Sequence, residues 1–91
     1  MSVNVRIPTQ LRQLTGGAGE IAVEGGTVRE ALASLESLHP GIGDRLLDDS
    51  GALRRFVNLF LADEDVRFLE GLDTPVAAGQ TLSVVPAVAG G

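Results

Sequence analysis

The N-terminal end of the chain alternates hydrophobic and polar positions. Val3, Val5 and Ile7 fall on one side of this alternation, and polar residues fall on the other. A two-residue period is typical of a strand with one buried face, so we predict a strand over residues 2–8. A glycine-rich turn and a second short strand, residues 20–24, follow it. Because several residues connect the strands, we expect a hairpin with a loop longer than a tight two-residue turn.

A helical period replaces the alternation after two consecutive glycines. Thr27 and Glu30 have the spacing of a capping box, in which Thr27 caps the first turn and Glu30 reaches back to the N–H of Thr27. Pro40 disfavours helical geometry in the residue before it, so the helix should end by His39. One apolar stripe runs along this segment and consists of Val28, Ala31, Leu32, Leu35 and Leu38. We therefore predict one main helix here.

Shorter elements fill the second half of the chain. The pattern predicts a helical turn over residues 42–47, strands over 56–61, 66–68 and 81–86, and a loop with a 3₁₀ turn over 70–76. The elements then follow the order β-β-α-β-β-β. This order indicates an α+β fold in which a mixed sheet carries one main helix on one face and the first and last strands lie parallel at its centre. It is the ubiquitin-like β-grasp arrangement.

Two of the predicted strands present side chains to the outer face of the sheet. If Leu82 and Val84 face the core, the two-residue period turns Val85 outward. In the strand over residues 56–61, Phe60 points outward if the odd-numbered residues face inward. The opposite register of that strand, with Phe60 in the core, remains open.

Length and composition limit the classes of protein. At 91 residues the chain is expected to form a single domain, and its hydrophobic fraction of 44% is sufficient for a folded core. The net charge is −5, the seven basic residues are scattered arginines, and Trp and Tyr are absent, which argues against binding to nucleic acid. No apolar run is long enough for a membrane span and no signal pattern is present, so we expect a cytoplasmic protein, monomeric when free, without membrane partners.

The inventory of reactive side chains is small. Cysteine is absent and His39 is the only histidine, which argues against a Cys or His metal site, thiol catalysis and a Ser-His-Asp triad. The acidic run over residues 63–65 is typical of a solvated turn. The glycines at 16–19 lack the Gly-Lys-Ser/Thr of a phosphate-binding loop, and they favour a hairpin connection.

The last residues have the composition of an extended arm. We expect residues 1–86 to form the domain and residues 87–91 to form a flexible tail that ends on Gly90 and Gly91. Glycine has no functional side chain, so the reactive group at this end is the α-carboxylate of Gly91. From Pro86 to Gly91 the backbone can reach roughly 17 Å, enough to enter a narrow site that admits backbone but no Cβ. A frayed terminus without function is the alternative.

Three segments carry a resemblance to a known family. They are residues 56–58 (Phe-Val-Asn), 63–68 (Asp-Glu-Asp-Val-Arg-Phe) and 86–91 (Pro-Ala-Val-Ala-Gly-Gly). With these residues and this element order, the chain resembles the ubiquitin-like sulfur carriers of the MoaD/ThiS type along its whole length. Within that family it is most similar to the carriers that deliver sulfur for cysteine synthesis.

The resemblance implies a definite chemistry for the tail. An E1-like enzyme that uses ATP and Mg²⁺ would adenylate the Gly91 carboxylate and convert it to a thiocarboxylate, while Gly90, Ala89 and Val88 thread its active site. This chain would bind no cofactor or metal itself, and it would be a protein co-substrate rather than an enzyme. The sulfur would pass to an acceptor enzyme, a cysteine synthase or a thiosugar-type synthase, and a metalloprotease would release the product in the cysteine pathway.

The resemblance also implies a docking face beside the tail. Val85, Val66 and Arg12 match family positions that contact the adenylating or the recipient enzyme, and Phe60 would join them if it points outward. Val85 and Val66, on neighbouring strands, would form a small apolar patch. The family often has a larger aromatic residue in place of Val85. For Val66, Val85 and Phe60 taken singly, packing in the core is the alternative.

Three other functions remain open at the level of the sequence. The chain could be the small subunit of molybdopterin synthase, or a ubiquitin-like modifier that is joined to the lysines of other proteins. Its own lack of lysine excludes chains of this protein linked through isopeptide bonds. It could also be a β-grasp interaction module with an inert terminus.

Overall fold

The computed structural model describes residues 2–55 and 57–86. Its elements in chain order are β1 (Ser2–Arg6), the 3₁₀ helix η1 (Thr9–Thr15), β2 (Glu20–Glu24), α1 (Val28–Leu38), α2 (Ile42–Leu46), β3 (Val57–Leu61), β4 (Glu64–Asp65), the 3₁₀ helices η2 (Val66–Phe68) and η3 (Gly71–Asp73), and β5 (Thr81–Pro86). The predicted tail, with Val88, Ala89, Gly90 and Gly91, lies outside the described residues. Within the described ranges, no helix has the length and apolarity needed to cross a membrane.

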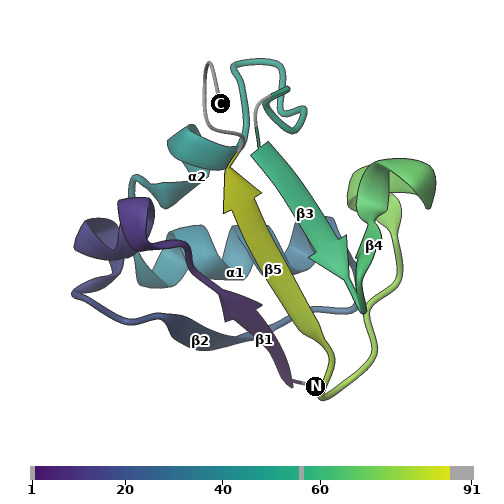
Figure 1. Cartoon of the computed structure of the whole chain (residues 1–91), viewed down its shortest axis with the longest axis horizontal. Helices are drawn as coiled ribbons and strands as arrows, with labels where there is room; N and C mark the ends of the chain where they lie inside the picture. Colours follow the sequence, from purple (N-terminus) through teal and green to yellow (C-terminus); the bar gives the residue numbers. More distant parts are fainter. Residues whose placement is uncertain (1, 56, 87–91) are drawn as a thin grey trace.

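The strands form one mixed sheet in the order β2-β1-β5-β3-β4. β1 and β5 are parallel neighbours at its centre, and β2 and β3 pair antiparallel with their outer sides. Figure 1 shows α1 crossing behind the sheet, while the opposite face of the sheet is turned toward the viewer. The predicted α+β fold, with the first and last strands parallel in the middle, is confirmed.

The core lies between the sheet and α1. Val3, Val5 and Ile7 are buried, as their alternation predicts, and Leu82 and Val84 join them from β5. The apolar stripe of α1 is buried at Val28, Ala31, Leu32 and Leu35, but Leu38 is 57% exposed. Leu38, the last residue of the helix, is therefore the member of the stripe that does not join the core.

The start of α1 has the predicted cap with one difference. The Thr27 hydroxyl accepts a hydrogen bond from the N–H of Glu30 at 3.2 Å. The Glu30 carboxylate, however, accepts from the N–H of Gly26 at 2.7 Å rather than from that of Thr27. The Glu30 carboxylate thus binds the residue before the N-cap and links the segment that follows β2 to the first turn of α1. At the other end, the N–H of His39 closes the helix on Leu35 at 2.8 Å.

The segment after β3 differs from the predicted return strand. Ala62 and Asp63 both have positive φ, so the turn from β3 to β4 is tight and reverses the chain at once. β4 then ends at Asp65, whose carboxylate accepts the N–H of Arg67 at 2.9 Å and caps η2. Residues 66–68 are therefore a 3₁₀ turn, and Phe68 is left 85% exposed.

Candidate functional site

The end of β5 is the part of the described chain that leads into the tail. Leu82 and Val84 are buried on the α1 side, and Val85 is 44% exposed on the other face. The predicted alternation along β5 is confirmed. β5 is paired with β1 from Thr81 to Ser83 and with β3 from Leu82 to Pro86. The pairing with β3 thus holds the backbone of β5 up to the last described residue.

Phe60 lies on the same face of the sheet as Val85. The odd-numbered residues of β3 are buried, so the register in which Phe60 points outward is the one adopted. Phe60 pairs with Ser83 and Asn58 pairs with Val85 across the β3–β5 ladder. Diagonal neighbours on one face of a sheet are within reach of an aromatic side chain. Half-buried Phe60 and exposed Val85 therefore form one continuous apolar strip on the outer face.

A hollow of about 450 Å³ lies beside this strip, between β5 and the start of η1. It brings together Arg12 and Val85, which are far apart in the sequence. Its lining consists of Arg6, Ile7, Pro8, Thr9, Gln10, Arg12, Ser83, Val84 and Val85. We call it the β5–η1 hollow. It combines two arginines with an apolar wall directly next to the point where the tail begins.

Arg12 is held at this hollow by its neighbours in the hairpin connection. Its Nε donates to the carbonyl oxygen of Ile7 at 3.1 Å. A Cβ added to Gly19 would lie 3.1 Å from the guanidinium carbon, so the glycine leaves the space that the guanidinium occupies. Gly16, with φ of 67°, ends η1 in the left-handed conformation that favours glycine. The glycines of this connection thus place an arginine beside β5.

Val66 does not belong to this face. It is fully buried, with 0% exposure, because the 3₁₀ turn η2 directs it into the core. The expected patch of Val66 and Val85 is therefore wrong, since the patch depended on a return strand over residues 66–68. The outer face beside the tail is formed by Phe60, Val85 and Arg12 without Val66.

Two polar residues next to Val85 were missed by the sequence reasoning. The Asn58 Oδ1 accepts a hydrogen bond from Arg67 Nη1 at 2.8 Å. Nη2 of the same arginine donates to the carbonyl oxygen of Arg54 at 2.7 Å. Arg67 thus ties β3 to the loop that precedes it, at the position directly opposite Val85. Arg67 lies in the 63–68 segment that carries the family resemblance, but the sequence does not show which groups its side chain binds.

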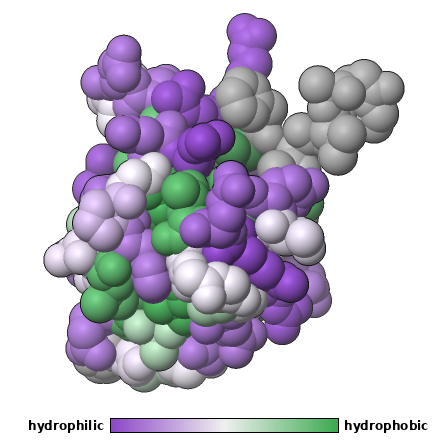
Figure 2. Space-filling model, turned by 90° about the vertical axis from the view of Figure 1, so that its left-hand side faces the viewer, coloured by the Kyte–Doolittle hydropathy of each residue, from purple (hydrophilic) through white to green (hydrophobic). Residues whose placement is uncertain are grey.

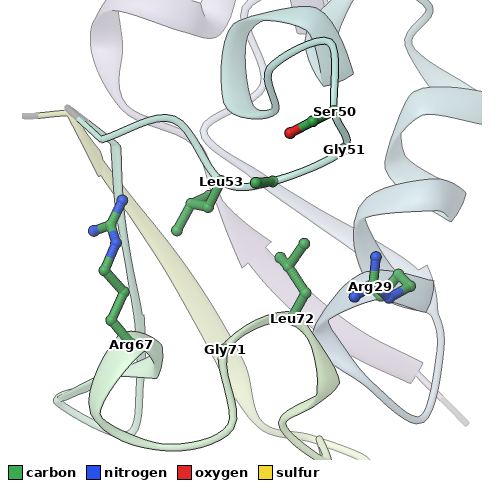
Figure 3. Close-up of a pocket in the computed structure, with 8 residues that line it drawn as sticks. Arg29, Ser50, Gly51, Leu53, Arg67, Gly71 and Leu72 are labelled. Atoms are coloured by element: carbon green, nitrogen blue, oxygen red, sulfur yellow. The ribbon is translucent and has the colours of Figure 1, made fainter.

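A second hollow, of about 420 Å³, also contains two arginines but differs in its contacts. In Figure 3 Leu53 and Leu72 point toward one another in its middle, while Arg67 and Arg29 lie at opposite ends. Arg29 is paired with Asp73 at 3.3 Å, and Arg67 makes the contacts to Asn58 and Arg54 given above. The arginines of the β5–η1 hollow also have partners within the chain, since Arg6 is paired with Glu20 at 3.7 Å and Arg12 donates to Ile7. We read the second hollow as structural because its apolar residues, Leu53 and Leu72, pack against the core.

Among the described residues, the carboxyl group of Asp48 has a lowered pKa. The hydroxyl of Ser50, followed by the N–H groups of Ala52 and Ser50, donates to Asp48, and these hydrogen bonds hold the pKa of Asp48 below its ordinary value. They fix the exposed loop that follows α2. Within residues 2–55 and 57–86, no group of His, Cys, Asp or Glu side chains is arranged to hold a metal ion.

A five-stranded mixed sheet, one main helix and a central last strand that leads into the C-terminal residues define a ubiquitin-like β-grasp protein. The chain belongs to the ThiS family, whose model matches residues 5–91. The match includes both the outer face of β3 and β5 and the residues of the predicted tail. The resemblance read from the sequence is confirmed at the level of the family.

Individual relatives agree with this assignment. The chain is 47% identical to the sulfur carrier protein CysO of Mycobacterium tuberculosis over 93 aligned residues, which cover all of both chains. It superposes with a TM-score of 0.92 on CysO from the crystal structure of the Amycolatopsis orientalis BexX/CysO complex, at 48% identity, with 98% of this chain and 99% of that chain covered. Small archaeal modifier protein 1 of Haloferax volcanii is more distant, with a TM-score of 0.82, 26% identity and coverage of 96% and 98%. The chain is thus a CysO-like member of the family.

Proposed function

We propose that this protein is a sulfur carrier for cysteine or a related sulfur metabolite, such as a thiosugar, and that Gly91 carries the sulfur. The observation that carries the proposal is the full-length similarity to CysO together with a central strand, β5, that leads directly into the Gly-Gly end. Pairing with β3 up to Pro86 gives a short arm a rigid base. The protein is then a co-substrate, and the catalysis belongs to its partners.

The proposed loading reaction has two steps. The Gly91 carboxylate attacks the α-phosphorus of Mg²⁺-bound ATP in an E1-like enzyme, which gives an acyl-adenylate and pyrophosphate. A sulfide equivalent then adds to the acyl carbon and expels AMP, and loss of a proton leaves the thiocarboxylate. A carboxylate is a poor electrophile because oxide is a poor leaving group, whereas AMP leaves readily. ATP and Mg²⁺ are bound by the enzyme, and this chain contributes the carboxylate.

The outer face beside the tail is proposed to dock the activating enzyme and the acceptor synthase in turn. Val85 and Phe60 supply apolar surface, and Arg12 at the β5–η1 hollow supplies positive charge. Such a transient contact needs roughly 800 Å² per partner. A CysO that is similar to this chain forms a complex with BexX, which supports the proposal that this chain also binds a partner protein.

Intact-mass spectrometry tests the proposal. After incubation with the cognate activating enzyme, ATP and a sulfide donor, we expect a species heavier than the free acid by the difference between sulfur and oxygen. Deletion of Gly91 should abolish this species while the thermal unfolding curve stays the same, because the buried core of the described residues ends at Val84. The free acid alone, under verified turnover of the enzyme, contradicts the carrier function.

The same experiment separates the other candidates. A ubiquitin-like modifier gives adducts on lysines of other proteins, which appear at much higher mass. A small subunit of molybdopterin synthase forms a lasting complex with a larger subunit, whereas a carrier is released after each transfer. An inert interaction module shows no change in mass with any of these partners.

A further inference from the structure

The strand β2 lies at one end of the sheet and has an uncovered edge. In the β1–β2 register Val5 lies opposite Ile21, so Ile7 lies opposite Gly19. The N–H of Ile7 donates to the carbonyl oxygen of Gly19 at 2.8 Å, so this is a hydrogen-bonded pair. Such pairs alternate along an antiparallel ladder. The odd-numbered residues of β2 therefore bond to β1, and the even-numbered ones direct their N–H and C=O away from the sheet.

Two further contacts agree with this orientation. The N–H of Asn4 donates to Gln80 at 2.9 Å, so the even-numbered residues of β1 bond on the side of β5. The carbonyl oxygen of Glu24, an even-numbered residue of β2, accepts from the Ser34 hydroxyl at 2.7 Å, outside the β1–β2 ladder. In the part of the chain that the structure describes, no strand lies beyond β2. Ala22 thus presents both of its backbone groups at the centre of this edge.

A hollow of about 250 Å³ follows the same edge on the side of α1. It is lined by Ala22, Val23, Glu24, Ser34, Ser37 and Leu38. Leu38, which the apolar stripe placed in the core, is 57% exposed here. Figure 2 views the molecule from the side on which β2 lies and shows apolar surface open to solvent among hydrophilic groups. An extended chain paired with β2 would direct alternate side chains into this hollow.

The charges along β2 decide which chain can pair there. Glu20 and Glu24 stand on both sides of Ala22, and all three side chains point to the outer face of the sheet. Glu20 also pairs with Arg6 of β1 at 3.7 Å, but its side chain remains 49% exposed and can accept a second cation. In an antiparallel pair of two copies centred on Ala22, Glu20 of each copy would face Glu24 of the other. Like charges directly opposite one another destabilise a strand pair, whereas opposite charges stabilise it. The net charge of −5 likewise disfavours the pairing of two copies and favours a basic partner.

We propose that the β2 edge binds an extended segment of a partner protein that adds a strand to the sheet. Basic residues of this segment face Glu20 and Glu24, and an apolar residue between them enters the hollow beside Leu38. Backbone hydrogen bonds to Ala22 give the affinity, as in other cases of strand addition. The edge is a different surface from the β5 face, so a partner bound there leaves Val85 and the tail free for the enzymes.

The probe for this proposal is a short peptide, acetyl-Lys-Val-Thr-Leu-Lys-amide, added to the full chain. Binding is followed by NMR titration and by exchange of backbone amide hydrogens. We expect the Ala22 amide to become protected and binding to weaken as salt is raised. The variant Ala22→Pro removes only an outward N–H, which an edge strand tolerates. It should lower the affinity by about fivefold to tenfold, since one hydrogen bond and its geometry are lost.

Two controls separate loss of the edge from loss of the fold. Ala22→Ser keeps the amide and should bind the peptide as the parent does, and thermal unfolding checks that Ala22→Pro remains folded. The double variant Glu20→Lys/Glu24→Lys leaves the backbone edge in place and should prefer a peptide with glutamates in place of the lysines. A peptide N-methylated at its threonine should lose binding to every variant.

Four results overturn the proposal. They are equal binding by Ala22→Pro, equal binding of the glutamate peptide by the parent, protection centred on β5 instead of β2, and a dimer of the parent chain that Ala22→Pro dissolves. The last result would assign the edge to a second copy of this chain. Each of them is independent of sulfur loading at Gly91, which the mass measurement above tests.

Discussion

The two arginine-containing hollows of this protein have nearly the same volume but differ in their apolar residues. The β5–η1 hollow, about 450 Å³, has Arg12 and Arg6 beside Val85, which is 44% exposed. The other, about 420 Å³, has Arg29 and Arg67 around Leu53 and Leu72, which pack against the core. In both hollows the arginines have partners within the chain. Volume and arginine content therefore do not separate a proposed docking surface from a structural contact, whereas the exposure of the apolar residues does.

The largest effect should come from placing a charge on the apolar strip of the first hollow. Val85→Asp is expected to lower affinity for the activating enzyme by about tenfold or more, because a carboxylate would have to lose its hydration against the partner. Stability should change little, since Val85 is 44% exposed. Binding measured by calorimetry, with urea unfolding as a check on the fold, tests this. An unchanged affinity would remove Val85 from the docking face.

Substitutions of the arginines in the second hollow should lower stability rather than affinity for a partner. Arg67→Ala removes hydrogen bonds to Asn58 and to the Arg54 carbonyl, and we expect a loss of about 1–2 kcal/mol in the free energy of unfolding. Arg29→Ala, the matched control in the same hollow, breaks an exposed ion pair with Asp73 and should cost less than about 1 kcal/mol. Urea titration measures both. Equal losses in the two variants would contradict a structural role particular to Arg67.

A smaller effect on binding is expected for Arg12→Ala. The guanidinium at the β5–η1 hollow should attract an acidic partner surface, so its removal lowers the association rate by about twofold to fivefold and reduces the dependence on salt. Arg29→Ala removes the same charge away from the proposed face and serves as the control. Stopped-flow association with the activating enzyme at two salt concentrations is the measurement. The same slowing in both variants would indicate a net-charge effect without local docking.

The smallest effect concerns stability alone, in the loop after α2, which lines the second hollow with Ser50. The pKa of Asp48 is lowered in the folded chain, chiefly by the Ser50 hydroxyl, so its carboxylate stabilises the fold above the ordinary pKa of 3.8. This contribution is lost as the pH falls through the lowered value. Asp48→Asn should therefore be less stable than the parent at neutral pH, with a difference that disappears at acid pH, while Asp49→Asn changes less. Urea unfolding from neutral to acid pH follows it, and a constant difference contradicts the assignment.

The sequence alone determined most of the strands, the main helix, the parallel pair at the centre of the sheet and the family. Regular apolar periods fix strands and helices because burial of one face selects the register, as in Val3, Val5 and Ile7 and in the stripe of α1. The alternation in β5 likewise predicted an outward Val85, and the segments shared with the family predicted the class of protein that the ThiS match confirms. For Phe60 the sequence left two registers, since both sides of the 56–61 run are apolar.

Only the tertiary structure decided which surface residues meet. After the tight turn at Ala62 and Asp63, η2 directs Val66 into the core, which removes it from the proposed docking face. The hairpin connection brings Arg12 to the hollow that Val85 lines, and the end of α1 leaves Leu38 beside the β2 edge. These outcomes depend on how separate elements approach one another in space. The hydrophobic period of a segment shows which side of that one helix or strand is buried, but it does not show which residues of other elements lie next to it.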